Sequence, residues 1–217
     1  FVSLLEPVRF RRRRLGVASA SMTHRTPEEL DAGLEHVRGA PSDGGELRLI
    51  VRRPDVDERE TIGEGVLDTE SGLVGDTWAP RGNSRSEDGR ADILAQVTIM
   101  NSRVLDVIAG PVDRWPRAGD QLYADLDLSH DNLPEGTRLA VGEALLEVTA
   151  KPHTGCGKFV QRFGLAAMRW VNSETGMQLR LRGVNTRVVK PGAIRVGDRV
   201  TKADGASGYA DWSGGEP

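Results

Sequence analysis

The chain has 217 residues, of which 38% are hydrophobic and 28% charged, so it suits one folded domain and disorder throughout is excluded. Its apolar runs are only a handful of residues long, far short of the roughly 20 that a membrane-spanning helix needs. Cys156 is the only cysteine, which excludes an internal disulfide and a four-thiolate zinc site and, with no secretory-type apolar region in view, predicts a cytoplasmic location.

The net charge of −3 hides a strong asymmetry along the chain. Residues 1–25 carry +5, residues 26–150 carry −14, residues 151–202 carry +9, and residues 203–217 carry −3. The basic segment 151–202 also holds the cysteine. Its positive field favours an anionic ligand, but pairing with the acidic half of the same domain explains the charge equally well.

The first 25 residues read as a basic extension that we expect to be disordered, with Met22 as a candidate start of translation. The arginine run 11–14 lacks interleaved aromatic residues and an amphipathic period. It therefore predicts neither nucleic-acid nor membrane binding.

The first regular element is a helix over 26–38, with Thr26 as N-cap, Pro27 in the first turn, and Gly39 as the stop. Alternating apolar residues then predict a strand over 47–52, which Pro54 ends.

Most later segments read as short strands separated by turns. We expect a buried strand over 94–100, a short helix from 101 or 102 to 108, a hairpin over 139–148 that turns at Gly142-Glu143, and further strands over 179–183, 187–189 and 192–200. Residues 81–91 and the tail 203–217 have the composition of mobile segments. The pattern predicts a mostly β fold over 26–202, a single-domain β-barrel with a few short helices.

Cys156 is the candidate functional residue. Gly155 and Gly157 remove bulk on both sides of the thiol, which predicts an accessible sulfur. A helix that begins near Lys158 would place the thiol at its positive end, where Lys158, Arg162 and His153 also favour the thiolate. A thiolate is both a nucleophile and a soft metal ligand, whereas the alternative is a buried structural cysteine.

Two other arrangements use the same cysteine. His153 and Cys156 have the spacing of a metal-ligand pair, and a zinc site would take further ligands from His130, Asp131 or Glu147. A cysteine–histidine hydrolase would need only an adjacent imidazole.

Downstream, Arg180 and Arg182 alternate with Leu179 and Leu181. On a strand both guanidinium groups would point to the same side and could hold a phosphate or carboxylate. A solvated face with surface ion pairs is the alternative interpretation.

Taken together, the motifs resemble the MOSC domain, named after the C-terminal domain of molybdenum cofactor sulfurases. The resemblance covers roughly residues 60–202. Its matching segments are 72–76, 96–100, 140–149, 155–159, 180–183 and 192–198. The order of these motifs, and the cysteine after the Leu146-Glu147-Val148-Thr149 strand, carry the resemblance.

The resemblance implies a barrel-like fold in which Cys156 carries sulfane sulfur as a persulfide or ligates the molybdenum of a bound molybdopterin. It implies that Arg180 and Arg182 meet the cofactor's anionic end. The further candidate cofactor-binding residues are Lys158, Arg162, His153, Asp76 and Asn132. Asp76 is followed here by Thr77-Trp78, and the segment His130-Asp131-Asn132-Leu133 keeps the acid and the amide of the family's Gly-Glu-Asn-Leu motif without its glycine. Asp76 and Asp131 also fit loop-holding Asx turns.

The implied partners are a separate cysteine desulfurase, which would carry the pyridoxal phosphate and donate sulfur, and a molybdoenzyme or a small-molecule substrate. Whether the protein is an enzyme stays open: a binding module for an anionic ligand and a molybdenum-dependent reductase of N-hydroxylated compounds are the alternatives.

Overall fold

The central feature is a barrel closed by strand β1 (Gly45–Arg52), which pairs with strands on both of its sides. In the computed structural model, which describes residues 24–82 and 88–203, the barrel order is β1-β11-β7-β8-β9-β5-β6 and back to β1. The other barrel strands are β5 (Val97–Asn101), β6 (Leu122–Asp125), β7 (Arg138–Val141), β8 (Ala144–Val148), β9 (Val184–Lys190) and β11 (Arg199–Ala203). β5 and β6 pair in parallel and the other barrel neighbours pair antiparallel, which makes a mixed barrel.

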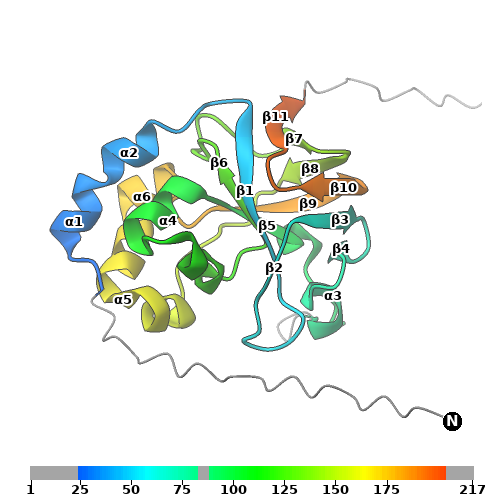
Figure 1. The fold of residues 1–217 in the computed structure, drawn as a ribbon, viewed down its shortest axis with the longest axis horizontal. Helices are drawn as coiled ribbons and strands as arrows, with labels where there is room; N and C mark the ends of the chain where they lie inside the picture. The colour runs from blue at the N-terminus through cyan, green and yellow to red at the C-terminus, as the bar shows by residue number, and fades with distance from the viewer. Residues whose placement is uncertain (1–23, 83–87, 204–217) are drawn as a thin grey trace, which may run out of the picture.

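Four shorter strands extend this core. β2 (Glu60–Ile62) continues the sheet beyond β1, and β3 (Glu64–Asp68), β4 (Gly72–Leu73) and β10 (Gly192–Arg195) form a separate small sheet. Figure 1 shows the small sheet and helix α3 (Trp78–Arg81) on one side of the barrel. The remaining helices gather on the opposite side (Figure 1): α1 (Pro27–Ala32), α2 (Leu34–Arg38), α4 (Ser102–Ile108), α5 (Gly157–Val171) and α6 (Glu174–Gln178). Two 3-10 helices, η1 (Ile93–Ala95) and η2 (Val112–Ala118), flank β5 and α4.

Alternation along the strands divides the apolar residues between two cores. Leu122 and Ala124 of β6 belong to one buried cluster with the inward residues of the other strands, whereas Tyr123 belongs to a second cluster with Leu105 and Phe163 of the helices. Successive side chains of a strand point to opposite faces. The barrel is therefore filled on the inside and covered by helices on the outside, which explains why β5 is buried at every position.

Several local predictions are confirmed. The hairpin β7–β8 turns at Gly142, whose φ is +53°, and Asn101 caps α4 through the backbone N–H of Arg103. Thr26 and Glu29 form a reciprocal capping box at the start of α1. The mostly β single-domain barrel with a few short helices is likewise confirmed.

The predicted helix over 26–38 is divided in two. Gly33 separates α1 from α2, and a Cβ at this position would lie 2.5 Å from Cγ2 of Val107. The close contact with α4 thus requires a glycine where the helical pattern alone would continue. The predicted strand over 94–100 also starts late, because Asp92 accepts a hydrogen bond from the backbone N–H of Leu94 and caps η1.

The prediction of a strand over 179–183 is wrong. Ser173 caps α6 through the backbone N–H of Gly176, and the chain then turns, with Leu181 N–H donating to the carbonyl of Gly176. Leu179 and Leu181 pack into the cluster beneath the helices. Two leucines separated by one residue can both be buried from this turn as well as from a strand. The Leu-x-Leu alternation therefore does not distinguish the two structures.

Three predictions fall, in part or almost entirely, on residues that the structure does not describe, and for the segment 81–91 these are residues 83–87. They concern the basic extension over 1–25, of which only 24 and 25 are described, the segment 81–91, and the tail 203–217. Among the residues that are described, none of the helices has the length and apolar character needed to cross a bilayer.

A test of the fold is offered by Gly183, which joins the turn to β9 with φ at +99°. A Cβ there would lie 2.3 Å from the carbonyl oxygen of Ile99, so we expect Gly183→Ala to lower the free energy of unfolding by about 3 kcal/mol. Gly63→Ala is the control, because a Cβ there meets nothing within 4 Å and should change stability by less than about 0.5 kcal/mol. Denaturant unfolding measures both, and equal stabilities would contradict the assigned backbone geometry.

Candidate functional site

Cys156 is exposed and stands at the N-cap of α5, as the sequence predicts. Its backbone is extended, with φ −124° and ψ 179°, and its carbonyl accepts the N–H of Val160 at 3.1 Å. The thiol makes no capping hydrogen bond, so it is free to react.

The loop before the cysteine is fixed by a residue that the sequence analysis did not single out. The carboxamide of Asn172 accepts the N–H of Gly155 at 2.8 Å and donates to its carbonyl at 3.2 Å. Asn172 is the C-cap of α5, and the chain returns to Gly155 because Gly164, with φ 89° and ψ 166°, breaks the helix in its middle. This double hydrogen bond holds the backbone next to the thiol.

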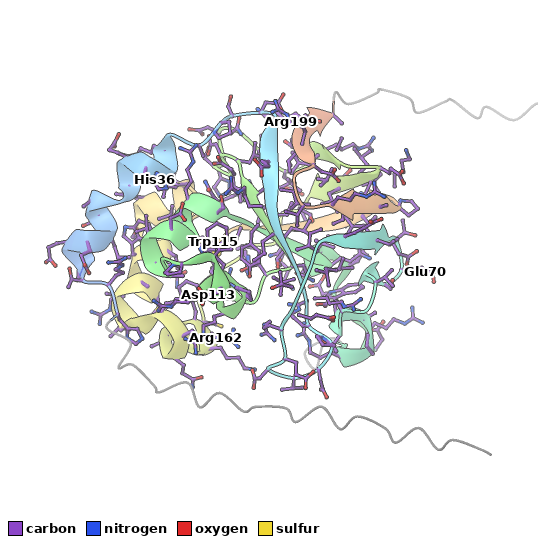
Figure 2. The ribbon with its side chains drawn as sticks, viewed as in Figure 1. His36, Glu70, Asp113, Trp115, Arg162 and Arg199 are labelled. Carbon is purple, nitrogen blue, oxygen red and sulfur yellow. The ribbon has the colours of Figure 1, made fainter. Side chains whose placement is uncertain are left out.

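Cys156 lines a cavity of about 720 Å³, measured with its open mouth, which we call the cysteine cavity. Its walls come from the loop between β1 and β2, from α3, from the end of η2 and from the start of α5. Figure 2 shows Arg162 of α5 near the loop between β1 and β2, consistent with its contact to Asp57 of that loop. Six basic residues line it: Arg53, Arg59, Arg81, Lys158, Arg162 and Arg182. Its acidic lining residues are Asp55 and Asp57.

Two of the cations are held by buried carboxylates behind the cavity. Arg53 donates to both oxygens of Asp76, at 2.8 and 2.7 Å, and the side chain of Asp76 is fully buried. Arg182 donates to Asp120 at 2.6 Å, again with a fully buried carboxylate, and its guanidinium lies 5.1 Å from the ring centre of Phe159. Asp76 and Asp120 thereby fix the orientation of the two arginines.

Two other basic residues of the cysteine cavity have no carboxylate partner among the described residues. Within the described residues, Arg59 and Arg81 form no ion pair, and the buried Nε of Arg59 has no hydrogen-bond partner. Burial lowers the pKa of both guanidinium groups, and the charges of Arg162 and Arg53 lower that of Arg59 further. Because both guanidinium groups stay charged far above neutral pH, the cavity contains two cations without an ion-pair partner among the described residues, and these can bind an anion.

Lys158 and Arg162 share Asp57, each at 3.4 Å. The aspartate is 65% exposed, so these ion pairs are screened by solvent and hold their partners weakly. An incoming anion can therefore recruit both cations at little cost.

His153 does not line the cysteine cavity. Its Nδ1 lies 3.5 Å from Asp120 and its side chain is 16% exposed. Burial, together with the positive charges of Arg182 and Arg53, lowers the pKa of His153 to about 3 although Asp120 opposes the shift. The imidazole is therefore neutral at pH 7, and it adds no charge that would favour a thiolate at Cys156.

The structure separates the two arginines that the sequence placed on one strand face. Arg180 lines a second cavity of about 470 Å³, also measured with its mouth, which we call the Arg180 cavity. His130 and His153 line it as well, and Arg182 does not. The prediction that both guanidinium groups point to the same side is therefore wrong. A helix and a turn precede β9, so these residues do not alternate between two faces as they would on a strand.

The remaining candidates have local partners. Asn132 donates to the carbonyls of Ser42 and Asp127 and accepts from Lys202, and it lines neither cavity. Asp76 also accepts the N–H of Trp78, which is the Asx turn considered from sequence, in addition to its ion pair. Over residues 24–82 and 88–203, no group of three or more histidine, cysteine or acidic side chains is placed to hold a metal, so the zinc arrangement finds no cluster there.

Sequence reasoning missed Arg53, Arg59, Arg81 and Asp120. All four come from the acidic part of the chain, 26–150, where the surrounding carboxylates hide the charge of the three arginines, and Asp120 reaches Arg182 across 62 residues. The only local signal was Arg52-Arg53 at the end of an apolar strand.

Comparison with known proteins agrees with this architecture. Residues 94–201 match the family model of the MOSC domain. The fold is similar to the crystal structure of the YUAD protein from Bacillus subtilis, with a TM-score of 0.54 and 18% identity over 72% of this chain and 93% of that chain. A crystal structure described as a hypothetical protein gives a TM-score of 0.50 and 18% identity, over 74% of this chain and 68% of that one. YiiM from Escherichia coli gives 0.48 and 17%, over 73% and 69%. No curated protein matches the sequence.

The neutral state of His153 predicts a pH dependence of stability. In the unfolded chain the imidazole binds a proton near pH 6.5, whereas in the folded protein it does so only near pH 3. Stability is therefore complete above pH 6.5 and is lost as the pH falls, by about 1 kcal/mol per pH unit between 6.5 and 4.5. His153→Gln should lack this component when the two proteins are unfolded with urea across that range, and parallel curves would show that the histidine titrates normally.

The buried pair Arg182–Asp120 predicts a large effect of removing one partner. Asp120→Asn leaves a buried cation uncompensated, so we expect a loss of about 3–5 kcal/mol in the free energy of unfolding at pH 7. The double variant Asp120→Asn with Arg182→Met should be more stable than the single one, because no unpaired charge remains. A single variant as stable as the wild type would mean that the pair is solvated in solution.

Proposed function

The chain contains a MOSC domain, and from this premise we propose that the cysteine cavity binds the molybdenum cofactor, with Cys156 as the soft ligand and the surrounding arginines as the phosphate anchor. One observation carries the proposal: an exposed thiol and a group of under-neutralised cations line one cavity. A thiolate suits a soft metal centre and the guanidinium groups suit a phosphate. Molybdopterin carries both ends in one molecule.

The residues present fit such a ligand. The unpartnered Nε of Arg59 lacks an acceptor that a phosphate oxygen would supply, and Arg81 lacks an ion-pair partner among the described residues. Arg53 and Arg182 are already oriented by their buried carboxylates, so little conformational entropy is lost when an anion binds. Within the described part of the chain the thiolate is the sole soft donor of the cavity, and further sulfur ligands would come with the pterin.

Each group of this chain has a separate task. The arginines bind and orient the anionic end, Lys158 and Arg162 exchange Asp57 for the ligand, and Cys156 holds the metal end near solvent. Bound molybdenum would supply oxygen-atom or electron transfer. A reductase of N-hydroxylated compounds is one activity within this class, and Arg180, Asp76, Asn132 and His153 as further cofactor contacts stay predictions.

A second candidate is sulfur transfer, and it is favoured by the free thiol at the helix N-terminus. The Cys156 thiolate would attack the outer sulfur of a donor persulfide, so that the donor's S–S bond breaks, a new S–S bond forms on Cys156, and the donor leaves as a thiolate. We propose a pyridoxal-phosphate cysteine desulfurase as the donor, a molybdoenzyme or its cofactor as the acceptor, and the reducing cytoplasm as the place. A binding module without turnover is the remaining alternative.

Metal and pterin analysis tests the proposal. Protein purified from cells that make the molybdenum cofactor should carry molybdenum and pterin, measured by plasma mass spectrometry and by fluorescence of the oxidised pterin. Arg59→Gln combined with Arg81→Gln should lower both by at least about tenfold, because a charge-assisted anchor is lost. Cys156→Ser should lower molybdenum and pterin together, because the two bind as one group and its soft protein ligand is lost.

Arg48→Gln is the matched control, since Arg48 is an exposed arginine outside the cavity and should leave both contents unchanged. Protein free of molybdenum and pterin, when made in competent cells and handled gently, would overturn cofactor binding. If intact-mass analysis of that protein after incubation with a desulfurase and cysteine shows one added sulfur that Cys156→Ser lacks, sulfur transfer is the function instead.

A further inference from the structure

We infer that the Arg180 cavity is a second ligand site, which takes a small organic carboxylic acid. The cavity lies between the loop after β8, helix α6 and the start of β9. It does not contain Cys156 and shares no lining residue with the cysteine cavity. The inference therefore does not rest on cofactor binding.

Arg180 lines this cavity, and one edge of its guanidinium has no hydrogen-bond partner among the described residues. Its Nη1 donates to the carbonyl of Leu133 at 2.5 Å and lies 3.5 Å from the carbonyl of Leu128. Among the described residues, Nε and Nη2 make no hydrogen bond and the guanidinium forms no ion pair. The Nε–Nη2 edge offers two parallel donors, which match the two oxygens of a carboxylate.

The backbone of Arg180 is held in an unfavourable conformation. Its φ is +49°, and only one other described non-glycine residue, Asp57, has a positive φ. The conformation is fixed by hydrogen bonds from Arg180 N–H to the carbonyl of Met177 and from Gly183 N–H to the carbonyl of Arg180. Such strain is found preferentially where a side chain must be aimed at a ligand.

The charge around Arg180 favours an anion. No acidic residue lines the cavity, and Lys151, which does, pairs with Asp92 outside the lining. Burial and the charge of Arg180 lower the pKa of His130, and His153 is neutral, so neither imidazole repels the guanidinium. His130 can offer a ring N–H, whereas Nδ1 of His153 faces Asp120. A bound carboxylate would meet one unpaired cation and a neutral donor.

The walls select an organic acid over a bare inorganic anion. Pro152, Met177 and Val184 line the cavity beside Ala150, and they offer apolar surface to the body of a ligand. The polar lining groups Thr149 and Asn185 are already engaged, by the carbonyls of Leu94 and of Lys151 and Pro152 respectively. A carboxylate with a flat apolar body satisfies Arg180 and covers this surface.

Titration with benzoate tests the inference, with benzamide as the neutral probe of equal shape and inorganic phosphate as the anion without a body. Binding is followed by isothermal calorimetry and by the imidazole NMR signals of His130 and His153. Benzoate should shift both histidines, while benzamide and phosphate bind at least about tenfold more weakly. Arg180→Gln should weaken benzoate binding at least about tenfold, and Arg180→Lys should weaken it less, because the charge stays and the fork is lost.

Three further variants make the result independent of any loss of fold in Arg180→Gln. Met177→Trp fills the cavity, keeps Arg180 and should abolish benzoate binding, whereas Arg187→Gln removes an exposed arginine outside the cavity and should leave it unchanged. Arg59→Gln, in the other cavity, should also leave it unchanged. The inference is overturned if benzoate does not bind at millimolar concentration, if benzamide binds equally well, or if Arg59→Gln rather than Arg180→Gln abolishes binding.

Discussion

The buried ion pair between Arg182 and Asp120 is the constraint on which both cavities depend. A guanidinium removed from water is tolerated only next to a carboxylate, and this carboxylate is fully buried at 2.6 Å. The pair ties the segment before β6 to the turn before β9 and places Arg182 against Phe159 in the lining of the cysteine cavity. It also puts Asp120 beside His153, which lines the other cavity. Burial of this chain of groups, together with the charges of Arg182 and Arg53, keeps the histidine neutral, so charges of the cysteine cavity act on a residue of the other cavity.

Both interpretations of the charge asymmetry, pairing within the domain and a site for an anionic ligand, apply to part of the basic residues. Much of the basic segment 151–202 pairs with the acidic half: Lys151 with Asp92, Arg182 with Asp120, Arg187 with Glu147, and Arg195 with Glu64. What remains for a ligand is a smaller set of cations, and part of it comes from the acidic half itself, at Arg59 and Arg81. Net charge per segment therefore located the basic region but not the residues that face a ligand.

Local signals predicted well wherever one short segment decided the outcome. The hairpin β7–β8, the caps Thr26 and Asn101, and the exposed cysteine at a helix start each depend on a few neighbouring residues, and the order of motifs sufficed for the MOSC domain. Prediction failed where contacts distant in sequence matter. The close approach of Val107 requires a glycine at position 33, where the first helix divides, and Leu179 and Leu181 pack from a turn rather than from a strand. The lining of the cysteine cavity comes from residues 53–182, a span that no single pattern reports.

The bend of α5 at Gly164 has a consequence for how the reactive sulfur is kept in place. A straight helix of 15 residues would be about 22 Å long and would carry Asn172 far from Gly155. The φ and ψ of Gly164 lie in a region that is essentially restricted to glycine, so the absence of one side chain lets the second half of the helix fold back on the first. The position of the Cys156 thiol thus depends on Gly164, eight residues downstream, and on the absence of a Cβ there. A substitution of this glycine would displace the sulfur without changing any residue that contacts it.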